Sequence, residues 1–295
     1  FSHYSVLLNE CIEGLAIRPD GIYVDGTAGG GGHSFEIASR LPEGGRLICL
    51  DRDDAALAAC SKRLAPFADR GTVVKSNFSE IESVLDMLGI DGIDGVMWDL
   101  GVSSYQLDEG ARGFSYHADA PLDMRMDQDQ ILTARDIVNE WPKDELVRIL
   151  RDYSEEKWAV RIAEIILEHR AKKPLETTAD LVACVDAAIP KKIRMQDSGH
   201  SARRTFQALR IDVNSEFEVL YDFLEKLPHV MNPGGRIAVL TFHSGEDRLV
   251  KKAFKQHMKE GLYSEVASDV IRPSAEECFQ NPRAKSTKMR WAVKA

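Results

Sequence analysis

The sequence has no long hydrophobic run and no recognisable export signal. Because no stretch of about 18 apolar residues occurs, we expect no membrane-spanning helix. The N-terminus lacks a basic segment followed by an apolar one, so we expect no secretory signal and a cytoplasmic protein. The chain begins at Phe1 rather than at Met, and we therefore expect that further residues precede it.

Cysteines are few and scattered, since the chain has five of them and no C-x-x-C pair. An odd, dispersed set of this kind indicates reduced thiols in the core of a cytoplasmic protein, and argues against a disulfide framework or a zinc site. No cluster of His, Cys and Asp has the spacing of metal ligands either. We therefore expect no catalytic metal.

An excess of positive charge is also absent, because the formal net charge is −9. This weakens an interpretation as a general nucleic-acid-binding protein, which needs Lys and Arg to bind phosphates. Four local basic clusters nevertheless occur, at residues 191–194, 203–210, 251–255 and 283–290. Any one of them is most simply a solvated surface, but together they indicate a restricted contact surface for a specific partner.

Glycine, in contrast, is concentrated in one place: it makes up five of the eight residues from Asp25 to Gly32. A short apolar run ending at Val24 precedes this loop, and a helical pattern at 35–40 follows it. Strand, glycine loop and helix in this order bring bare backbone close to a nucleotide-like ligand. A glycine-rich turn without any ligand is the alternative, and the ordered elements around the loop argue against it.

The next strand, at 46–50, ends at Asp51, twenty residues after Gly31. A carboxylate there can accept hydrogen bonds from a ribose diol, which both dinucleotides and S-adenosylmethionine carry. The dinucleotide pattern G-x-G-x-x-G fails, because Ser34 and Phe35 stand where its last glycine would be. Asp25 at the start of the loop favours a ligand with an ammonium and a sulfonium over one with a pyrophosphate.

Strand and helix patterns alternate along both ends of the chain, which predicts a parallel sheet with right-handed crossovers. Further strands are expected at 72–75, 93–100, 236–241 and 289–293, and further helices at 55–64, 79–88, 216–227 and 246–258, with a turn at 232–235. Between Ser103 and Glu216 no strand is evident, and helices are expected at 144–153, 155–172 and 178–188, with Thr133 and Thr177 as N-caps. We therefore predict a discontinuous α/β core (1–104 and 216–295) interrupted by a helical domain (105–215).

Ligands of such folds bind beyond the carboxyl ends of the strands, where Asp25, Asp51 and Asp99 are expected. Any one of these acids alone could simply cap a helix. Residues 99–104 lie where amino-methylating enzymes hold their target amine, although the two prolines usual there are absent and Tyr105 is the only nearby ring. An acceptor for the N–H groups would direct the lone pair of the amine at the methyl group, and positioning would supply most of the catalysis.

We assign catalytic roles to Asp99, Ser103 and His243. His243 follows the strand expected at 236–241, and two interpretations of it stay open. It is either a general base or a hydrogen-bonded loop residue.

Several long segments together identify a resemblance that covers nearly the whole chain. They are residues 3–8, 25–34, 51–53, 99–104, 106–108, 112–115, 121–127, 204–211, 242–244, 246–248 and 281–286. In these segments the chain closely resembles the bacterial ribosomal RNA small subunit methyltransferase H family. One departure is Gly245, where the family usually has leucine, and we expect it to loosen the loop around His243.

The resemblance implies a Rossmann-like class I S-adenosylmethionine-dependent methyltransferase with an inserted all-helical domain that helps to seat RNA. The implied reaction is N4-methylation of a cytidine in the decoding region of 16S ribosomal RNA, within the small ribosomal subunit. The implied cofactor is S-adenosylmethionine, held by Gly31, Gly32 and His33 in the loop, Asp51 at the ribose, Phe78 beside the adenine, and Asp99 and Gln106 near the methionine end. The sequence leaves open whether the chain forms a homodimer.

The irregular stretch at 108–127 has two interpretations. It is a lid or RNA-facing loop, or it serves packing through Phe114, Leu122 and Met124. For the chain as a whole, three alternative functions remain. They are a methyltransferase for small molecules or proteins, a non-catalytic ribosome-assembly factor that binds the cofactor, and a nicotinamide-dependent dehydrogenase.

Overall fold

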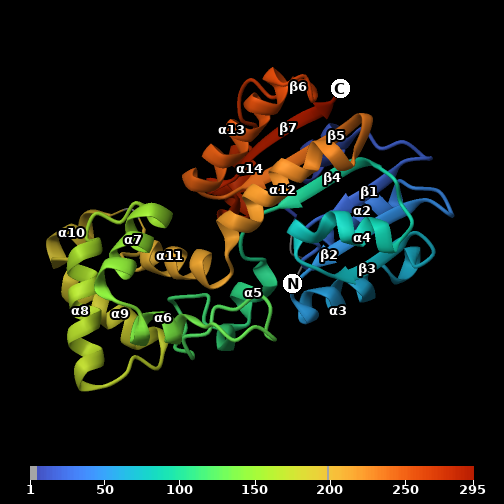
Figure 1. Ribbon diagram of the computed structural model, residues 1–295. Coiled ribbons are helices and arrows are strands. Elements are labelled where there is room, and N and C mark those ends of the chain that lie inside the picture. Colours follow the sequence, from blue (N-terminus) through green and yellow to red (C-terminus); the bar gives the residue numbers. More distant parts are fainter. Residues whose placement is uncertain (1–4, 198) are drawn as a thin grey trace. The chain divides into compact units, whose positions relative to one another are not determined.

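A computed structural model describes residues 5–197 and 199–295 (Figure 1). Predictions about His3, Tyr4 and the ring of Tyr105 lie outside the described residues and side chains. The chain divides into two compact units, one formed by Phe1–Gly101 with Phe217–Ala295 and the other by Val102–Glu216. Each unit is described by itself.

The first unit is built on a seven-stranded sheet in the order β3-β2-β1-β4-β5-β7-β6. Its strands are β1 (Ile22–Asp25), β2 (Arg46–Asp51), β3 (Gly71–Lys75), β4 (Ile93–Asp99), β5 (Met231–Thr241), β6 (Tyr263–Val266) and β7 (Lys288–Lys294). The first five are parallel, while β7 is antiparallel to both β5 and β6. This confirms the doubly wound α/β prediction. The strand order reverses between β1 and β4, and ligands of such sheets bind at that point.

Helices cover both faces of this sheet because its strands are apolar on both sides. Successive residues of β1 show this, since Tyr23 and Val24 point to opposite faces and belong to different apolar clusters. The cluster of Tyr23 includes side chains of α1 (Leu8–Leu15), α2 (Gly32–Ser39) and α3 (Asp54–Arg63). The cluster of Val24 includes side chains of α4 (Ile81–Met87), α12 (Glu216–Val230) and α13 (Ser244–Lys259). The short helix α14 (Ala275–Gln280) precedes β7.

The second unit is helical, and the structure gives it no strand within its described residues. Its helices are α5 (Ser104–Asp108), α6 (Ala134–Glu140), α7 (Lys143–Ser154), α8 (Ala159–Lys172), α9 (Thr178–Ala188), α10 (Lys191–Gln196) and α11 (Arg203–Val213). Both predicted N-caps are confirmed, because Thr133 and Thr177 each form a capping box with an aspartate three residues later. One apolar cluster draws residues from α6, α7, α8, α9 and α11 and includes Phe114, Leu122 and Met124.

Two boundaries and one strand show where the structure differs from the sequence-based expectation. Helix α8 begins at Ala159 rather than at residue 155, because Glu155 has a φ of 53° and ends α7. Strand β5 begins at Met231, so the predicted turn at 232–235 is an irregularity inside the strand, with Gly234 at a φ of 79°. The four residues of β6 were missed because a short, half-exposed edge strand gives little sequence signal.

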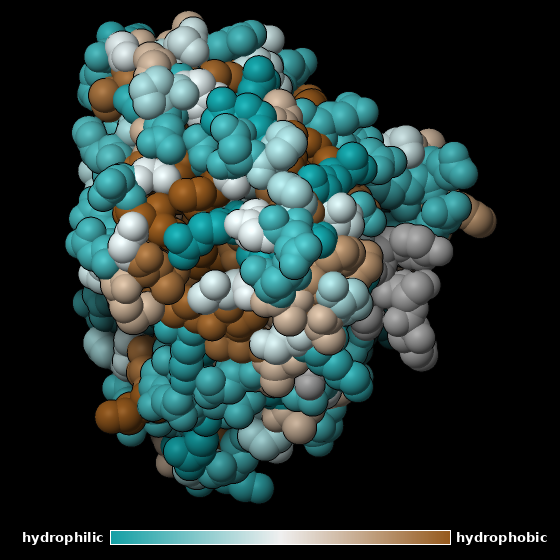
Figure 2. Space-filling model, turned by 90° about the vertical axis from the view of Figure 1, so that its right-hand side faces the viewer, coloured by the Kyte–Doolittle hydropathy of each residue, from teal (hydrophilic) through white to brown (hydrophobic). Residues whose placement is uncertain are grey.

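Within the described part of the chain, no helix is both long and apolar enough to cross a bilayer. Figure 2 shows a face that is mostly hydrophilic, with hydrophobic residues gathered near its centre.

Candidate active site

The glycine loop between β1 and α2 has one open position. Gly31 has a φ of 85° and precedes the first residue of α2, and a Cβ there would lie 3.2 Å from the Cα of Cys60. Gly30, in contrast, faces open space, since nothing lies within 4 Å of where its Cβ would be. The loop therefore packs tightly on one side and presents bare backbone on the other, as a ligand-binding loop requires.

Asp51, at the end of β2, holds this loop in place. Its Oδ2 accepts a hydrogen bond from the backbone N–H of Gly29 (3.0 Å), and its Oδ1 accepts one from that of Asp53 (3.0 Å). Burial raises the pKa of Asp51 to about 6, and the two backbone donors only partly oppose this. Each carboxylate oxygen keeps a second lone pair, so Asp51 can also accept hydrogen bonds from a ribose diol.

Asp25, at the end of β1, is internal rather than ligand-facing. It is 1% exposed and accepts hydrogen bonds from the hydroxyl of Ser34 (2.6 Å) and the backbone N–H of Thr27 (3.2 Å). Burial raises its pKa to about 6. The predicted influence of Asp25 on a cationic ligand would therefore act through its charge, because its oxygens brace the loop and the start of α2.

Asp99, at the end of β4, is the most perturbed acid of the group. Its backbone is tied to the loop, because the hydroxyl of Thr27 donates to the Asp99 carbonyl and accepts from the Asp99 N–H (2.9 Å). Burial raises the pKa of its carboxyl to about 8, with smaller contributions from Asp25 and Glu246. Its side chain nevertheless remains 30% exposed. Surrounding protein thus removes much of the water around the Asp99 carboxyl, but part of the side-chain surface stays open to a ligand.

Positive charge does not compensate these acids. Among the residues that the structure describes, no Lys or Arg forms an ion pair with Asp25, Asp51 or Asp99. The Nδ1 atom of His33 lies 3.9 Å from Asp99 Oδ2. Burial lowers the pKa of His33 to about 4, so it is neutral at pH 7. Asp25 and Asp51, each with a pKa of about 6, are mostly ionised at pH 7, and a cation would favour the ionised form of Asp99 as well, so the strand ends suit a cationic ligand.

The tautomer of His33 follows from its other contact. Its Nε2 lies 3.0 Å from the carbonyl oxygen of Val6, which can only accept, so we assign the proton to Nε2. The ring is 6% exposed and is held by this bond. His33 therefore presents an unprotonated Nδ1 toward Asp99.

His243 is a helix cap in this structure. Its ring Nδ1 accepts from the backbone N–H of Glu246 (3.4 Å) at the start of α13, and its Nε2 lies 3.4 Å from Glu246 Oε1. This geometry is that of a hydrogen-bonded loop residue, and a catalytic role of His243 stays a prediction. Gly245 does not loosen the segment: it lies in the first turn of α13, where a Cβ would come within 2.8 Å of the ring of Phe217.

Glu246 is a site residue to which sequence reasoning gave no role. It is 2% exposed, and its Oε1 accepts from the backbone N–H of Phe242 (3.0 Å). It also contributes to the raised pKa of Asp99. An acid in the first turn of a helix is so common that its sequence position alone gives no signal.

Phe78 lies deeper than its predicted role suggests. Its ring is 3% exposed and stacks on Trp98 with centroids 4.5 Å apart. The same ring fills the space where a side chain of Gly26 would be. A contact with adenine would therefore use the backbone of Phe78 or the edge of its ring.

Ser103 and Gln106 belong to the second unit and bind each other at the start of α5. The backbone N–H of Ser103 donates to Gln106 Oε1 (3.1 Å), and the backbone N–H of Gln106 donates to Ser103 Oγ (3.1 Å). This reciprocal pair is a capping arrangement, and Gln106 is 4% exposed. Their grouping with Asp99 around a cofactor stays a prediction.

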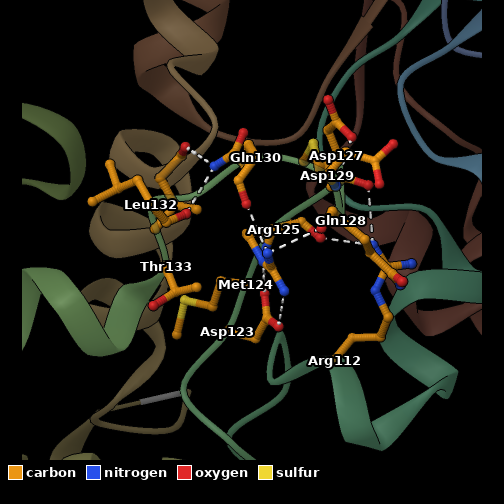
Figure 3. A network of polar contacts seen from close by, with 12 residues as sticks. Arg112, Asp123, Met124, Arg125, Asp127, Gln128, Asp129, Gln130, Leu132 and Thr133 are labelled. Carbon is orange, nitrogen blue, oxygen red and sulfur yellow. Dashed lines mark hydrogen bonds and ion pairs between the residues drawn. The ribbon is translucent and has the colours of Figure 1, made fainter.

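The irregular stretch after α5 is stabilised by its own polar contacts (Figure 3). Arg125 forms a bidentate pair with Asp123 (2.8 and 2.9 Å) and donates to the carbonyls of Gln128 (3.0 Å) and Gln130 (2.7 Å). Arg112 donates to the carbonyl of Arg125 (2.6 Å). Phe114, Leu122 and Met124 lie in the core of the helical unit, which supports the packing interpretation of this stretch.

Metal ligands do not gather in the described part of either unit, where no group of three or more His, Cys, Asp or Glu side chains could hold an ion.

Comparison with known proteins decides the class of this site. The model of the MraW methylase family matches residues 1–295. The chain belongs to the MraW methylase family. Its fold is accordingly the Rossmann-like fold of class I S-adenosylmethionine-dependent methyltransferases, with a helical insertion.

Two relatives of the methylase illustrate the similarity. The ribosomal RNA small subunit methyltransferase H of Symbiobacterium thermophilum is 50% identical over 100% of this chain and 97% of its own. The protein of the same name from Clostridioides difficile is 49% identical over 100% of this chain and 99% of its own. Among solved structures, the O-methyltransferase TomG of Streptomyces achromogenes has 12% identity and a TM-score of 0.43 over 98% of this chain and 78% of its own, too low to inform the site.

Proposed function

We propose that this methyltransferase methylates N4 of one cytidine in the decoding region of 16S ribosomal RNA, with S-adenosylmethionine as the methyl donor. One observation carries the proposal. Asp99 is a partly exposed, uncompensated carboxylate beside an open glycine loop, at the switch point of the sheet. The names of the relatives, which act on small-subunit ribosomal RNA, support the substrate class.

The residues present fit the cofactor. Gly30 leaves room along the loop, and the backbone of Gly31, Gly32 and His33 opens α2, where N–H groups point outward. Asp51 has acceptor capacity for the ribose, and Asp99 offers negative charge for the methionine end. When bound, S-adenosylmethionine supplies an electrophilic methyl group on a sulfonium.

Asp99 would act on the amine that receives the methyl group. The exocyclic amine of cytosine is a poor nucleophile because its lone pair is delocalised into the ring. A carboxylate oxygen of Asp99 that accepts an N–H hydrogen bond returns electron density to the nitrogen and orients it. The same oxygen can then take the proton that the methylated amine loses, and a pKa of about 8 makes it a suitable acceptor near neutral pH.

The RNA would meet this site as an unpaired nucleotide. A base that reacts at its exocyclic amine has to leave its stack, which costs a few kcal/mol and is easiest in a loop that is already exposed. The acidic chain fits recognition of a shaped ribosomal particle better than general affinity for RNA. We assign RNA seating to the helical unit, Val102–Glu216.

The test uses labelled S-adenosylmethionine and three acceptors: small ribosomal subunits that lack the modification, free metabolites and purified proteins. We expect label only in the RNA of the subunits. Asp99→Ala should abolish transfer while particle binding remains, and Asp91→Ala, which changes an exposed acid before β4, should leave both intact. Label in metabolites or proteins would favour another substrate class. Particle binding by the wild type without any transfer would favour an assembly factor.

A further inference from the structure

The helical unit carries a group of aromatic and imidazole rings from two distant segments. Tyr116 and His200 are stacked, with centroids 4.6 Å apart and an interplanar angle of 29°. His117 lies 4.5 Å from Tyr116 and 6.0 Å from His200. Phe206 meets Tyr116 edge-on at 5.6 Å. We call Tyr116, His117 and His200 the ring group.

The ring group packs against the core of the helical unit on one side and reaches the surface through its imidazole rings. Phe206 is buried, and Tyr116 packs against the apolar core of the unit. His200 is half-buried and His117 is exposed. His200 is fixed by its Nδ1, which accepts from the backbone N–H of Ala202 (3.0 Å). His200 is thus fixed beside Tyr116, and the exposed ring of His117 offers a flat ligand a further surface on which to stack.

Positively charged side chains gather in the segment that leads to His200, but some have structural partners. Arg194 lies 3.3 Å from Asp186 and donates to the carbonyl of Ile189 (3.1 Å). Arg204 lies 3.1 Å from Asp197. Arg194 therefore ties α10 to the end of α9, and Arg204 ties α11 to the turn after α10, so both guanidinium groups already have partners within the unit.

Lys191, Lys192 and Arg203 differ from them. All three are exposed, and none forms an ion pair with any residue in the described ranges 5–197 and 199–295. The guanidinium of Arg203 lies 3.3 to 3.6 Å from where a Cβ of Gly199 would be, next to His200. Against a chain charge of −9, Lys191 and Lys192 lie within nine residues of His200 in the sequence, and Arg203 follows it three residues later.

A ligand that suits both cations and exposed rings carries phosphates and unstacked bases, as single-stranded nucleic acid does. Proteins bind it by combining cations for the backbone with rings for the bases. We propose that the ring group with Lys191, Lys192 and Arg203 is the surface on which this unit binds single-stranded RNA flanking the target nucleotide. This rests on the proposed function for its choice of RNA.

The test measures binding of a fluorescent single-stranded RNA of about 12 nucleotides. His117→Ala with His200→Ala should weaken binding at least about 5-fold for each stacked base. His117→Trp should retain or improve it. Lys191→Ala, Lys192→Ala and Arg203→Ala together should make the salt dependence of the binding constant shallower by about 2 on a double-logarithmic plot, at about 0.7 per contact.

Matched controls come from the same unit. His169→Ala changes a half-buried histidine on α8, and Arg151→Ala with Lys172→Ala and Lys173→Ala removes the same charge elsewhere. We expect these controls to leave the affinity and the salt slope unchanged. Calorimetry with S-adenosylmethionine should give wild-type affinity for all variants, which shows that each one is folded.

Two results would overturn the proposal. The first is RNA affinity that is equal in the ring variants and the controls. The second is unchanged affinity for the oligonucleotide with lost binding to small subunits, because the surface would then contact a ribosomal protein. Failure of the proposed function is distinguishable from both: the wild type would not methylate 16S ribosomal RNA, while the ring variants would still lose RNA affinity.

Discussion

The affinity for S-adenosylmethionine should depend on pH in a way that the affinity for its demethylated product does not. Asp99 has a pKa of about 8 without ligand, so only about a tenth of it is ionised at pH 7. The ionised form attracts a sulfonium, and the product lacks that charge. Because binding of the cation then requires loss of a proton, affinity should rise with pH and level off above about pH 8.

The size of the effect follows from simple electrostatics. Opposite unit charges about 4 Å apart interact by roughly 4 kcal/mol near a protein surface, which corresponds to about 3 pKa units. That is enough to keep the carboxyl of Asp99 ionised in the complex down to about pH 5. Between about pH 6 and about pH 8 the affinity should therefore rise by up to about tenfold per pH unit.

The assay is calorimetric titration with S-adenosylmethionine and with its demethylated product across that pH range. The product is the control for the α-amino group and for Asp51, because both ligands share the amino acid and the ribose. Asp99→Asn should remove the difference between the two pH profiles. Equal profiles for both ligands in the wild type, or an unchanged difference in Asp99→Asn, would refute the assignment of Asp99 to the sulfonium.

Four further outcomes follow from the site. Gly31→Ala should weaken cofactor binding and lower the free energy of unfolding by about 1–2 kcal/mol, because the φ of Gly31 is 85°. Gly30→Ala places its methyl group in open space, so denaturant unfolding should show less than half of that loss. Asp51→Ala should weaken the cofactor and its demethylated product equally in calorimetry, because it acts on the ribose; a selective loss of one would contradict this. His243→Asn should keep the helix cap and the activity, while His243→Ala should lose about 1 kcal/mol of folding stability. An inactive, folded His243→Asn variant would instead support the interpretation of His243 as a general base. The pKa of Asp99 is about 8 in the folded protein and 3.8 in the unfolded chain, so unfolding releases a proton between these two values. The melting temperature without ligand should therefore fall as the pH rises toward about 8. The fall should be smaller in Asp99→Asn.

Sequence patterns predicted the sheet well because they reflect local physics. The run that ends at Asp51 is apolar on both faces, as a strand covered by helices on both sides must be, and Thr133 and Thr177 cap helices through contacts within four residues. The irregularity in β5 was missed because the pairing of Met231 with Ile93 depends on a strand far away in the chain. Local signals cannot report such pairing.

The candidate site was harder to predict than the fold. The positions of Asp25, Asp51 and Asp99 at strand ends followed from the sequence, but their environments did not. The burial of Asp25 and its hydrogen bond from the Ser34 hydroxyl are apparent only in the folded structure. The part played by Glu246 likewise depends on packing rather than on residue type.

The central claim is that this site methylates the N4 amine of one cytidine in the decoding region. Mass-spectrometric mapping of 16S ribosomal RNA, from cells with and without this protein, tests it most directly. We predict one methyl group that depends on the protein, located on N4 of a single decoding-region cytidine, and restored in vitro by wild type but not by Asp99→Ala. Identical methylation maps from the two cell lines, or a methyl group on another atom or region, would contradict the account.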